Sequence, residues 1–515
     1  MKNRDTLLRL ADFQTQCHSD EQNSSKNSVW LWQHFPLLSV VVFMSLTVGC
    51  TSNIAFRAEE TVCRESQCDK RSAMIEQHQD KDNKPKFDLA FVEFTERGNV
   101  FDRESMEKVL AHVHRFATTD TGNHLPYPTG KDGAPGVLVV VFVHGWRHNA
   151  DVEDRNVQSF RGLLEKASNS EVRHQILGNR RLIGIYVGWR GLVVNPDSPL
   201  SLPSYWDRKT VAHEVGKGGV SELLLRLQHS VLGGDDLRED RESKNLFLVT
   251  GHSFGGAIVL SALNEILLER IISARPIEGR CDQQVSLNCT CLQTRPFTHG
   301  VVLLNPAIEA NDILQLKELV AQRCFAPAQN KLLHVISSDA DAATHRFFPI
   351  GQWLAMLSWQ EAQFPRRFGN TEITFEESEL DRTTIGNFVP FRTGKFTKNG
   401  TEWKYENCEN GKDECLSEFG GDLTEKRRHI PVSDHEPLAF ISTDGHFIED
   451  HNDVFNENVA AYLAAIVDQT RTKQHPTNGD VPRQCKNGDK FDFDGCFKHF
   501  HGIFRNGSHA SRPDF

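Results

Sequence analysis

The chain has 515 residues, a length that allows either several domains or one α/β domain with large insertions. Hydrophobic residues make up 38% of the sequence, which is enough for a sizeable buried core. The formal net charge of −11, without any basic stripe, excludes a nucleic-acid-binding surface, so we expect no nucleic-acid partner.

The first fifty residues contain a short apolar segment that ends in a cysteine. Residues 37–49 are apolar or small and precede Cys50. This run is too short to span a bilayer but is typical of a secretory signal. Thr47-Val48-Gly49-Cys50 resembles the lipobox of bacterial lipoproteins, which implies that residues 1–50 are a signal peptide and that Cys50 is lipidated. The protein would then be exported and membrane-anchored at the periplasmic or outer-membrane surface of a bacterial cell envelope. A signal that is cleaved without lipidation is the alternative.

Cysteine usage also indicates export. Two of the 12 cysteines, Cys17 and Cys50, lie in the expected leader. Short-range disulfides in an oxidising compartment fit the local grouping of the others, although the pairing within the group of four stays open. A zinc site near Cys485, Cys496 and His499 is the alternative, but no C-x-x-C spacing supports it, so we expect no metal. The groups are Cys63 and Cys68; Cys281, Cys289, Cys291 and Cys324; Cys408 and Cys415; Cys485 and Cys496.

After the leader, polar residues 51–85 show little periodicity and predict a flexible tether. Residues 87–94 then alternate like a strand, and residues 103–116 have helical spacing. The run 136–143 is almost wholly apolar, as expected of a strand buried on both faces of a parallel sheet, and ends in His144-Gly145-Trp146. A helix over 151–167 and a strand over 182–187 follow.

Residues 245–256 predict a strand, a tight turn and a helix with a serine at the tip. Leu246 to Thr250 is an aliphatic and β-branched run, and residues 257–272 have helical spacing. Between them lies a G-x-S-x-G motif, Gly251-His252-Ser253-Phe254-Gly255. Glycines flank the serine because a strained turn leaves no room for side chains, so the hydroxyl projects clear of the sheet. We interpret Ser253 as a nucleophile, whereas a glycine-rich packing turn is the alternative.

The remaining chain continues to alternate between strands and helices, which is the signature of a mainly parallel sheet with helices on both faces. A functional site should lie at the carboxyl ends of those strands. The predicted strands cover 300–304, 331–337, 438–442 and 446–448, and the last helix covers 454–467.

At this point the chain resembles the α/β-hydrolase superfamily. The likeness covers residues 87–470 and depends on His144-Gly145-Trp146 after a strand, the G-x-S-x-G turn, and an acid followed by a late histidine. The resemblance is strongest to esterases and lipases, whose nucleophile turn often reads G-H-S-x-G-G. It implies an α/β-hydrolase fold over residues 86–475, with inserted lid segments.

The resemblance also implies a Ser-His-Asp triad in the chain order serine, acid, histidine. Two acids follow the 331–337 strand. We favour Asp341 over Asp339 because Ser338 and Asp341 match the small-residue-x-x-Asp loop that is common in the enzymes that this chain resembles. Either aspartate is also a candidate helix cap. For the base we favour His451 over His446, since Asp444-Gly445 predicts a hairpin that would place His446 in a returning strand.

The tetrahedral intermediate needs two backbone N–H donors for its oxyanion. Phe254, the residue after the nucleophile, would supply one donor, and by resemblance Trp146 would supply the other.

Three insertions interrupt the expected domain, at 191–240, 274–299 and 345–437. The start of the longest, residues 347–359, is strongly apolar, which is typical of a lid over an acyl pocket or of an ordinary buried helix. Residues 476–515 form a tail that contains cysteines and histidines and has no function that we can derive.

These features predict a serine hydrolase that cleaves carboxylic esters, from small molecules or lipids, through an acyl-enzyme on Ser253, without a cofactor. A thioesterase or peptidase would use the same triad. A catalytically inert envelope binding protein with the same fold is the alternative from another class.

Overall fold

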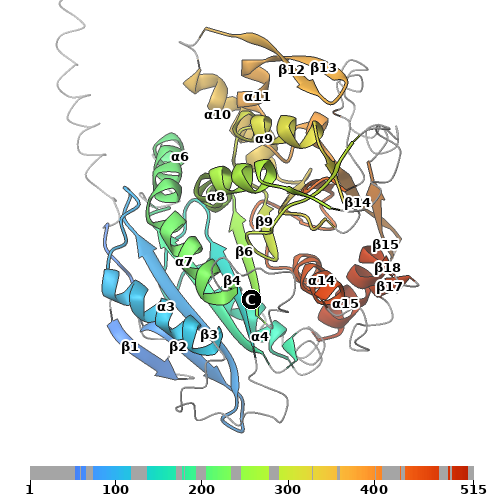
Figure 1. Ribbon diagram of the computed structural model, residues 1–515. Coiled ribbons are helices and arrows are strands. Elements are labelled where there is room, and N and C mark those ends of the chain that lie inside the picture. Colours follow the sequence, from blue (N-terminus) through green and yellow to red (C-terminus); the bar gives the residue numbers. More distant parts are fainter. Residues whose placement is uncertain are drawn as a thin grey trace, which may run out of the picture. The chain divides into compact units, whose positions relative to one another are not determined.

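Parallel strands form the centre of the fold. In the computed structural model (Figure 1), the described residues build an eleven-stranded sheet with the order β1-β2-β3-β5-β4-β6-β9-β11-β16-β14-β15. Every neighbouring pair from β3 to β14 in this order is parallel, whereas β2 is antiparallel to β3 and β15 is antiparallel to β14. The predicted α/β class with a mainly parallel sheet is therefore confirmed.

The structure describes residues 53–57, 59–64, 73–117, 136–169, 177–178, 180–192, 204–232, 245–277, 289–326, 329–356, 360–400, 402–408, 430, 435–474, 485–487 and 490–507. The strands of the large sheet are β1 (Glu59–Arg64), β2 (Ala73–Gln79), β3 (Pro85–Phe94), β4 (Val137–Val143), β5 (Arg181–Trp189), β6 (Leu246–His252), β9 (Gly300–Leu304), β11 (Leu333–Ser338), β14 (Gly394–Asn399), β15 (Glu402–Asn407) and β16 (Leu438–Thr443).

Side chains of each central strand alternate between two hydrophobic cores, one on each face of the sheet. In β4, Val139 and Val141 lie in the first core and Val140 and Phe142 in the second, which explains why the whole run is apolar. The first core is covered by α3 (Arg103–Ala117), α6 (Ser204–Val215), α7 (Ser221–Leu232), α8 (Phe254–Ile272) and α9 (Asn311–Ala321). The second is covered by α4 (Arg155–Ala167), α14 (Glu457–Gln474) and α15 (Phe493–Gly507).

The side of the sheet on which the next strand is added changes between β4 and β6, which are parallel to each other. After β4 the chain passes through α4 to β5 on one side, whereas after β6 it passes through α8 to β9 on the other side. The loops that leave the carboxyl ends of these adjacent strands therefore diverge, and ligand sites of open parallel sheets form at such a switch point.

The N-terminal boundary of the fold needs a correction. We expected residues 51–85 to be a tether, but β1 and β2 extend the sheet, and Ala73, Met74 and Ile75 are buried. The buried Arg57 is ion-paired with Glu76 in β2 at 3.0 Å. The prediction of a tether was wrong because it assumed that the charged residues of this segment face water. Arg57 and Glu76 instead pair with each other inside the fold. The expected signal peptide, including Cys50, lies outside the described residues.

A second correction concerns residues 444–448. They form a turn after β16 in which Asp444 accepts hydrogen bonds from the N–H groups of Phe447 and Ile448, so the expected strand over 446–448 is absent. Phe447 and Ile448 are apolar because they are buried in the second core, where Phe447 packs on Phe396 and Phe497.

The expected insertions contribute to the core. Residues 191–240 supply α6 and α7, and the long 345–437 segment supplies β14 and β15 of the large sheet. A three-stranded sheet of β7 (Arg275–Pro276), β8 (Cys291–Gln293) and β10 (Cys324–Phe325) carries the Cys289–Cys324 disulfide. The smaller elements are the helical segments Gly216–Val220, Ala343–Phe347 and Val389–Phe391, the helices α10 (Phe348–Ala355) and α11 (Glu377–Arg382), and the strands β12 (Gln363–Phe368), β13 (Thr371–Glu376), β17 (Lys486–Asn487) and β18 (Lys490–Phe491).

The C-terminal segment is also part of the domain. α15 buries Phe497 and Phe500 in the second core, next to α14, and a disulfide joins Cys485 to Cys496. The division that we expected at residue 475 is therefore wrong for the described part of this segment. Cys291 and Cys408 are disulfide-bonded as well.

The apolar start of the 345–437 segment forms α10, which presents an unusual outer face. Phe348 and Gln352 of α10 are buried, whereas Ile350, Trp353 and Leu354 of the same helix are 57%, 47% and 46% exposed, and Phe347, directly before it, is 66% exposed. Within the described ranges, none of the helices has both the length and the apolar character that crossing a membrane requires.

Candidate active site

Ser253 lies at the tip of a tight turn between β6 and α8. Its backbone has φ 55° and ψ −122°, a conformation that residues other than glycine rarely adopt and that is expected only where the surroundings enforce it. The neighbouring glycines permit the turn, because a Cβ on Gly251 would lie 2.6 Å from the Gly255 oxygen and one on Gly255 only 2.0 Å from the Val143 oxygen. The turn thus holds the hydroxyl beyond the end of the sheet, as the motif predicts.

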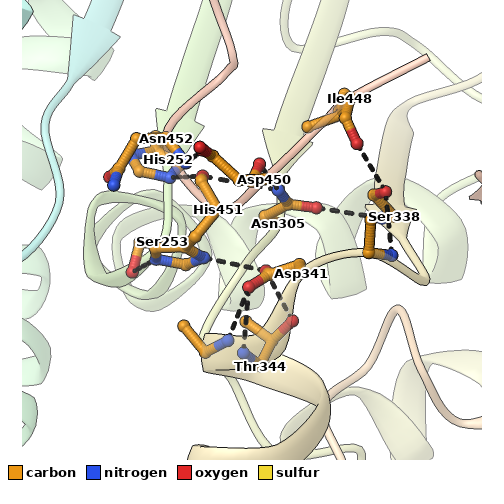
Figure 2. A network of polar contacts seen from close by, with 12 residues as sticks. His252, Ser253, Asn305, Ser338, Asp341, Thr344, Ile448, Asp450, His451 and Asn452 are labelled. Atoms are coloured by element: carbon orange, nitrogen blue, oxygen red, sulfur yellow. Dashed lines mark hydrogen bonds and ion pairs between the residues drawn. The ribbon is translucent and has the colours of Figure 1, made fainter. Parts of the chain in front are cut away.

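Three residues from distant parts of the sequence meet at the carboxyl ends of β6, β11 and β16 (Figure 2). His451 Nε2 lies 2.9 Å from Ser253 Oγ, and His451 Nδ1 lies 2.8 Å from Asp341 Oδ2. The carboxylate can only accept, so Nδ1 donates a proton to it and Nε2 is left to accept the serine proton. Such an arrangement can transfer a proton from the hydroxyl to the imidazole while the carboxylate stabilises the cation that forms.

Asp341 serves the site and the local backbone at once. Oδ2 accepts from His451 and from the Thr344 hydroxyl at 2.6 Å, whereas Oδ1 accepts from the N–H groups of Ala343 and Thr344 and so caps the helical segment that follows. Burial raises the pKa of the Asp341 carboxyl, but hydrogen bonds from His451 and Thr344 outweigh it and hold the pKa below its usual value. The side chain is fully buried and charged.

The two alternative residues lie elsewhere. Asp339 is surrounded by Arg392, Lys395 and Ser442, and burial raises the pKa of its carboxyl to about 6. His446 is 67% exposed, and its Nδ1 lies 3.4 Å from Asp444 Oδ2. Asp341 and His451 are therefore the acid and the imidazole that lie together with the serine.

The loop after β4 passes directly against the serine. A Cβ on Gly145 would lie 2.9 Å from Ser253 Cβ, so the peptides on either side of this glycine are next to Ser253. His144 anchors the loop, since its Nε2 accepts from the Trp189 N–H at 3.1 Å and its carbonyl accepts from the Trp189 indole at 2.8 Å. The Trp146 and Phe254 rings both pack on Tyr205 of α6, with ring centroids 5.6 and 4.8 Å from it. Trp146 and Phe254, which follow the carboxyl ends of β4 and β6, therefore share Tyr205 as a neighbour.

Exposure differs across the three residues. Ser253 is 4% exposed, whereas the His451 side chain is 21% exposed. The histidine is therefore the part of the site that faces solvent.

Sequence reasoning missed the buried residues that hold the His451 loop. His252 and Asn305 contact the backbone of that loop, and Thr344 contacts the acid. The signals for His252 were its place in the G-H-S-x-G-G likeness and at the end of β6, whereas Asn305 was marked only by its place at the end of β9.

Two clusters of the described residues have side chains of the types that bind metals. In the first, Cys485 and Cys496 form a disulfide, so they do not offer thiolates to an ion. In the second, His213, Glu309 and Asp312 lie together, but Lys209 is ion-paired with Glu309 and its ammonium opposes a cation there. Neither cluster is part of the serine site.

Comparison with protein-family models, with curated protein sequences and with solved structures finds no match to this chain.

Proposed function

We propose that this chain is a serine hydrolase of the α/β-hydrolase type that cleaves carboxylic esters through an acyl-enzyme on Ser253. The observation that carries the proposal is the hydrogen-bonded series Ser253–His451–Asp341 at the carboxyl ends of parallel strands. The serine of this series has a positive φ. A catalytically inert protein with this fold would not require a strained backbone that places a serine hydroxyl next to an imidazole.

The contacts support the following reaction. His451 Nε2 takes the Ser253 proton as Oγ attacks the ester carbonyl, and Asp341 stabilises the imidazolium. The tetrahedral oxyanion is bound by the N–H groups of Phe254 and Trp146; Phe254 is the first residue of α8, where the N–H groups have no acceptor within the helix. The imidazolium then protonates the alcohol as the C–O bond breaks. Water, deprotonated by His451, attacks the acyl-enzyme, and the imidazolium returns the proton to Ser253 Oγ as the acyl–Oγ bond breaks and the acid is released.

The substrate class follows from the surface near the acid. The helical segment capped by Asp341 leads directly into α10, whose exposed face consists of Phe347, Ile350, Trp353 and Leu354. An exposed apolar face on the helix that follows the acid loop favours substrates with an acyl chain, so we include lipid esters in the proposal. We also propose that the protein is exported and lipid-anchored through Cys50, on the sequence features alone.

Hydrolysis of p-nitrophenyl esters of increasing acyl length tests the proposal. The wild type should hydrolyse them, and Ser253→Ala should lose at least about a thousandfold in kcat, because the residual rate without a nucleophile is small. Ser337→Ala is the matched control, since Ser337 is a buried serine of β11 whose hydroxyl has no hydrogen-bond partner among the described residues. Equal rates for wild type and Ser253→Ala would overturn the proposal.

A further inference from the structure

We propose that His252, Asn305 and Ser338 act together as positioning residues that hold the backbone of the His451 loop at the distance that the reaction requires. The inference depends on the proposed function and deepens it, because it assigns the alignment of the general base to three side chains outside the triad. We call these three residues the loop clamp.

The loop needs support from outside because it has no regular structure of its own. Residues 444–456 connect β16 to α14 through turns, so no ladder of backbone hydrogen bonds fixes His451. Its imidazole must nevertheless meet Ser253 on one side and Asp341 on the other, at 2.9 and 2.8 Å. Both contacts depend on where the loop backbone lies.

Each residue of the loop clamp donates a hydrogen bond to a loop carbonyl (Figure 2). The Ser338 hydroxyl donates to the Ile448 carbonyl at 2.7 Å, and His252 Nε2 donates to the His451 carbonyl at 2.7 Å. Asn305 Nδ2 lies 3.3 Å from the Asp450 carbonyl and 3.4 Å from that of His451. The three donors lie at the carboxyl ends of β6, β9 and β11, which are neighbours in the sheet. The ends of these three central strands therefore set the position of the loop.

The donors are themselves fixed. Asn305 Oδ1 accepts the Ser338 N–H at 3.0 Å, which leaves the amide nitrogen to face the loop carbonyls. Asn305 has φ 42°, a conformation that asparagine tolerates better than most residues, and its own N–H donates to the Ile336 carbonyl at 2.8 Å. The side chain is therefore locked from both ends.

His252 is fixed by its burial. The residue is 1% exposed, and its Nδ1 has no hydrogen-bond partner among the described residues. Burial lowers its pKa well below the usual value, so the ring stays neutral. Since a carbonyl can only accept, the single ring proton is on Nε2, and the bond to the His451 carbonyl is the one that this ring makes. Its ring also contacts the His451 ring, with centroids 4.8 Å apart.

Variants that remove only the donors test the loop clamp. His252→Phe keeps a ring without a donor, His252→Gln places an amide N–H near the position of Nε2, and Ser338→Ala removes the hydroxyl. Thr250→Val is the matched control, because the buried Thr250 hydroxyl donates to the Val141 carbonyl at 2.8 Å within the same sheet but does not contact the loop. For each variant we would measure the melting temperature, kcat and KM on a short-chain p-nitrophenyl ester, and the rate of fluorophosphonate labelling.

His252→Phe and Ser338→Ala should lower kcat and the labelling rate about tenfold to a hundredfold with little change in KM, since displacements of about 1 Å in a reacting group cost that much. His252→Gln should recover most of the rate, and Thr250→Val should keep it despite a similar loss in melting temperature. Rates for His252→Phe and Ser338→Ala equal to that of Thr250→Val in an active wild-type background would overturn the loop clamp alone. A wild type that neither hydrolyses esters nor reacts would overturn the proposed function as well.

Discussion

Asp341 uses its two oxygens for two different sets of contacts, which explains why capping a helix and contacting an imidazole were not alternatives. Oδ1 caps the segment after the β11 loop, and Oδ2 faces His451. The short side chain accepts both sets of donors because the loop folds back over it within three residues. The capping contacts hold the Asp341 side chain in one rotamer after the carboxyl end of β11. In this rotamer its second oxygen faces the His451 imidazole.

Asp341→Asn and Asp339→Asn make a matched pair. The amide at 341 can no longer accept strongly from Nδ1 and favours the wrong imidazole tautomer, so we expect kcat to fall roughly 10³- to 10⁴-fold. Asp339 does not contact His451, so Asp339→Asn should stay within about threefold of the wild type. The kcat of both variants is measured by steady-state kinetics on one soluble ester. An equal loss of kcat in both variants would contradict the proposal that Asp341, and not Asp339, orients His451.

At the residue scale, the sequence sufficed for side chains that belong to a motif or follow a strand. Ser253 and Asp341 were reached in this way, whereas His451 was favoured over His446 because of an expected hairpin that the structure does not form; the structure places the three residues in contact. The loop clamp was not reached, because a hydrogen bond from a side chain to the backbone of a distant loop leaves no pattern in the sequence. Asn305 and Asp450 are far apart in the chain and become neighbours only when β9, β11 and the loop are assembled.

At the scale of elements, α10 is unusual because several of its large apolar side chains are exposed to solvent. Most amphipathic helices turn their apolar face to the core, whereas α10 exposes Ile350, Trp353 and Leu354. Because α10 follows the acid loop in the chain, we propose that this face contacts the acyl chain of the substrate.

Ile350→Ser and Trp353→Ser should therefore lower kcat/KM about tenfold for long-chain esters and leave short-chain esters unchanged. Both side chains are largely exposed, so the free energy of unfolding should change by no more than about 0.5 kcal/mol. Leu225→Ser is the control, since Leu225 of α7 is 44% exposed. If both acyl lengths respond alike, or neither responds, the helix has no role in substrate selection.

Most central elements could be predicted because a strand that is buried on both faces is apolar along its whole length. β4, β6, β9 and β11 were identified for this reason, with ends that differ from the observed ones by at most two residues. β2 was missed because its buried residues include Glu76, whose charge is compensated by Arg57 and Arg161 from other segments. β14 and β15 were missed because they lie at the sheet edge, where β15 has a partner strand on one side only and carries polar side chains.

At the scale of the whole molecule, the buried charges around β2 link stability to pH. Burial would raise the pKa of Glu76, but hydrogen bonds from His78 and Arg161 and the charges of Arg161 and Arg57 lower it to about 2 from 4.5. A carboxyl with a depressed pKa contributes stability above its unfolded value and loses it as the pH falls toward the folded value.

Glu76→Gln should therefore destabilise the protein at neutral pH, by an amount on the order of 3 kcal/mol from the shift in pKa. The difference between variant and wild type should shrink as the pH falls from about 4.5 to about 2. Urea unfolding across this range measures both curves. A difference that does not change with pH would show that the Glu76 charge is not what stabilises the N-terminal edge of the sheet.

The whole account depends on a reactive serine, and site-resolved labelling tests that claim most directly. Folded wild-type protein would be treated with a fluorophosphonate, and the modified peptide identified by mass spectrometry. We predict one adduct, on Ser253, and a strongly reduced rate in a folded His451→Ala variant, because the hydroxyl is activated by that imidazole. Folded wild-type protein that remains unlabelled, or carries the adduct on another residue, would contradict the account.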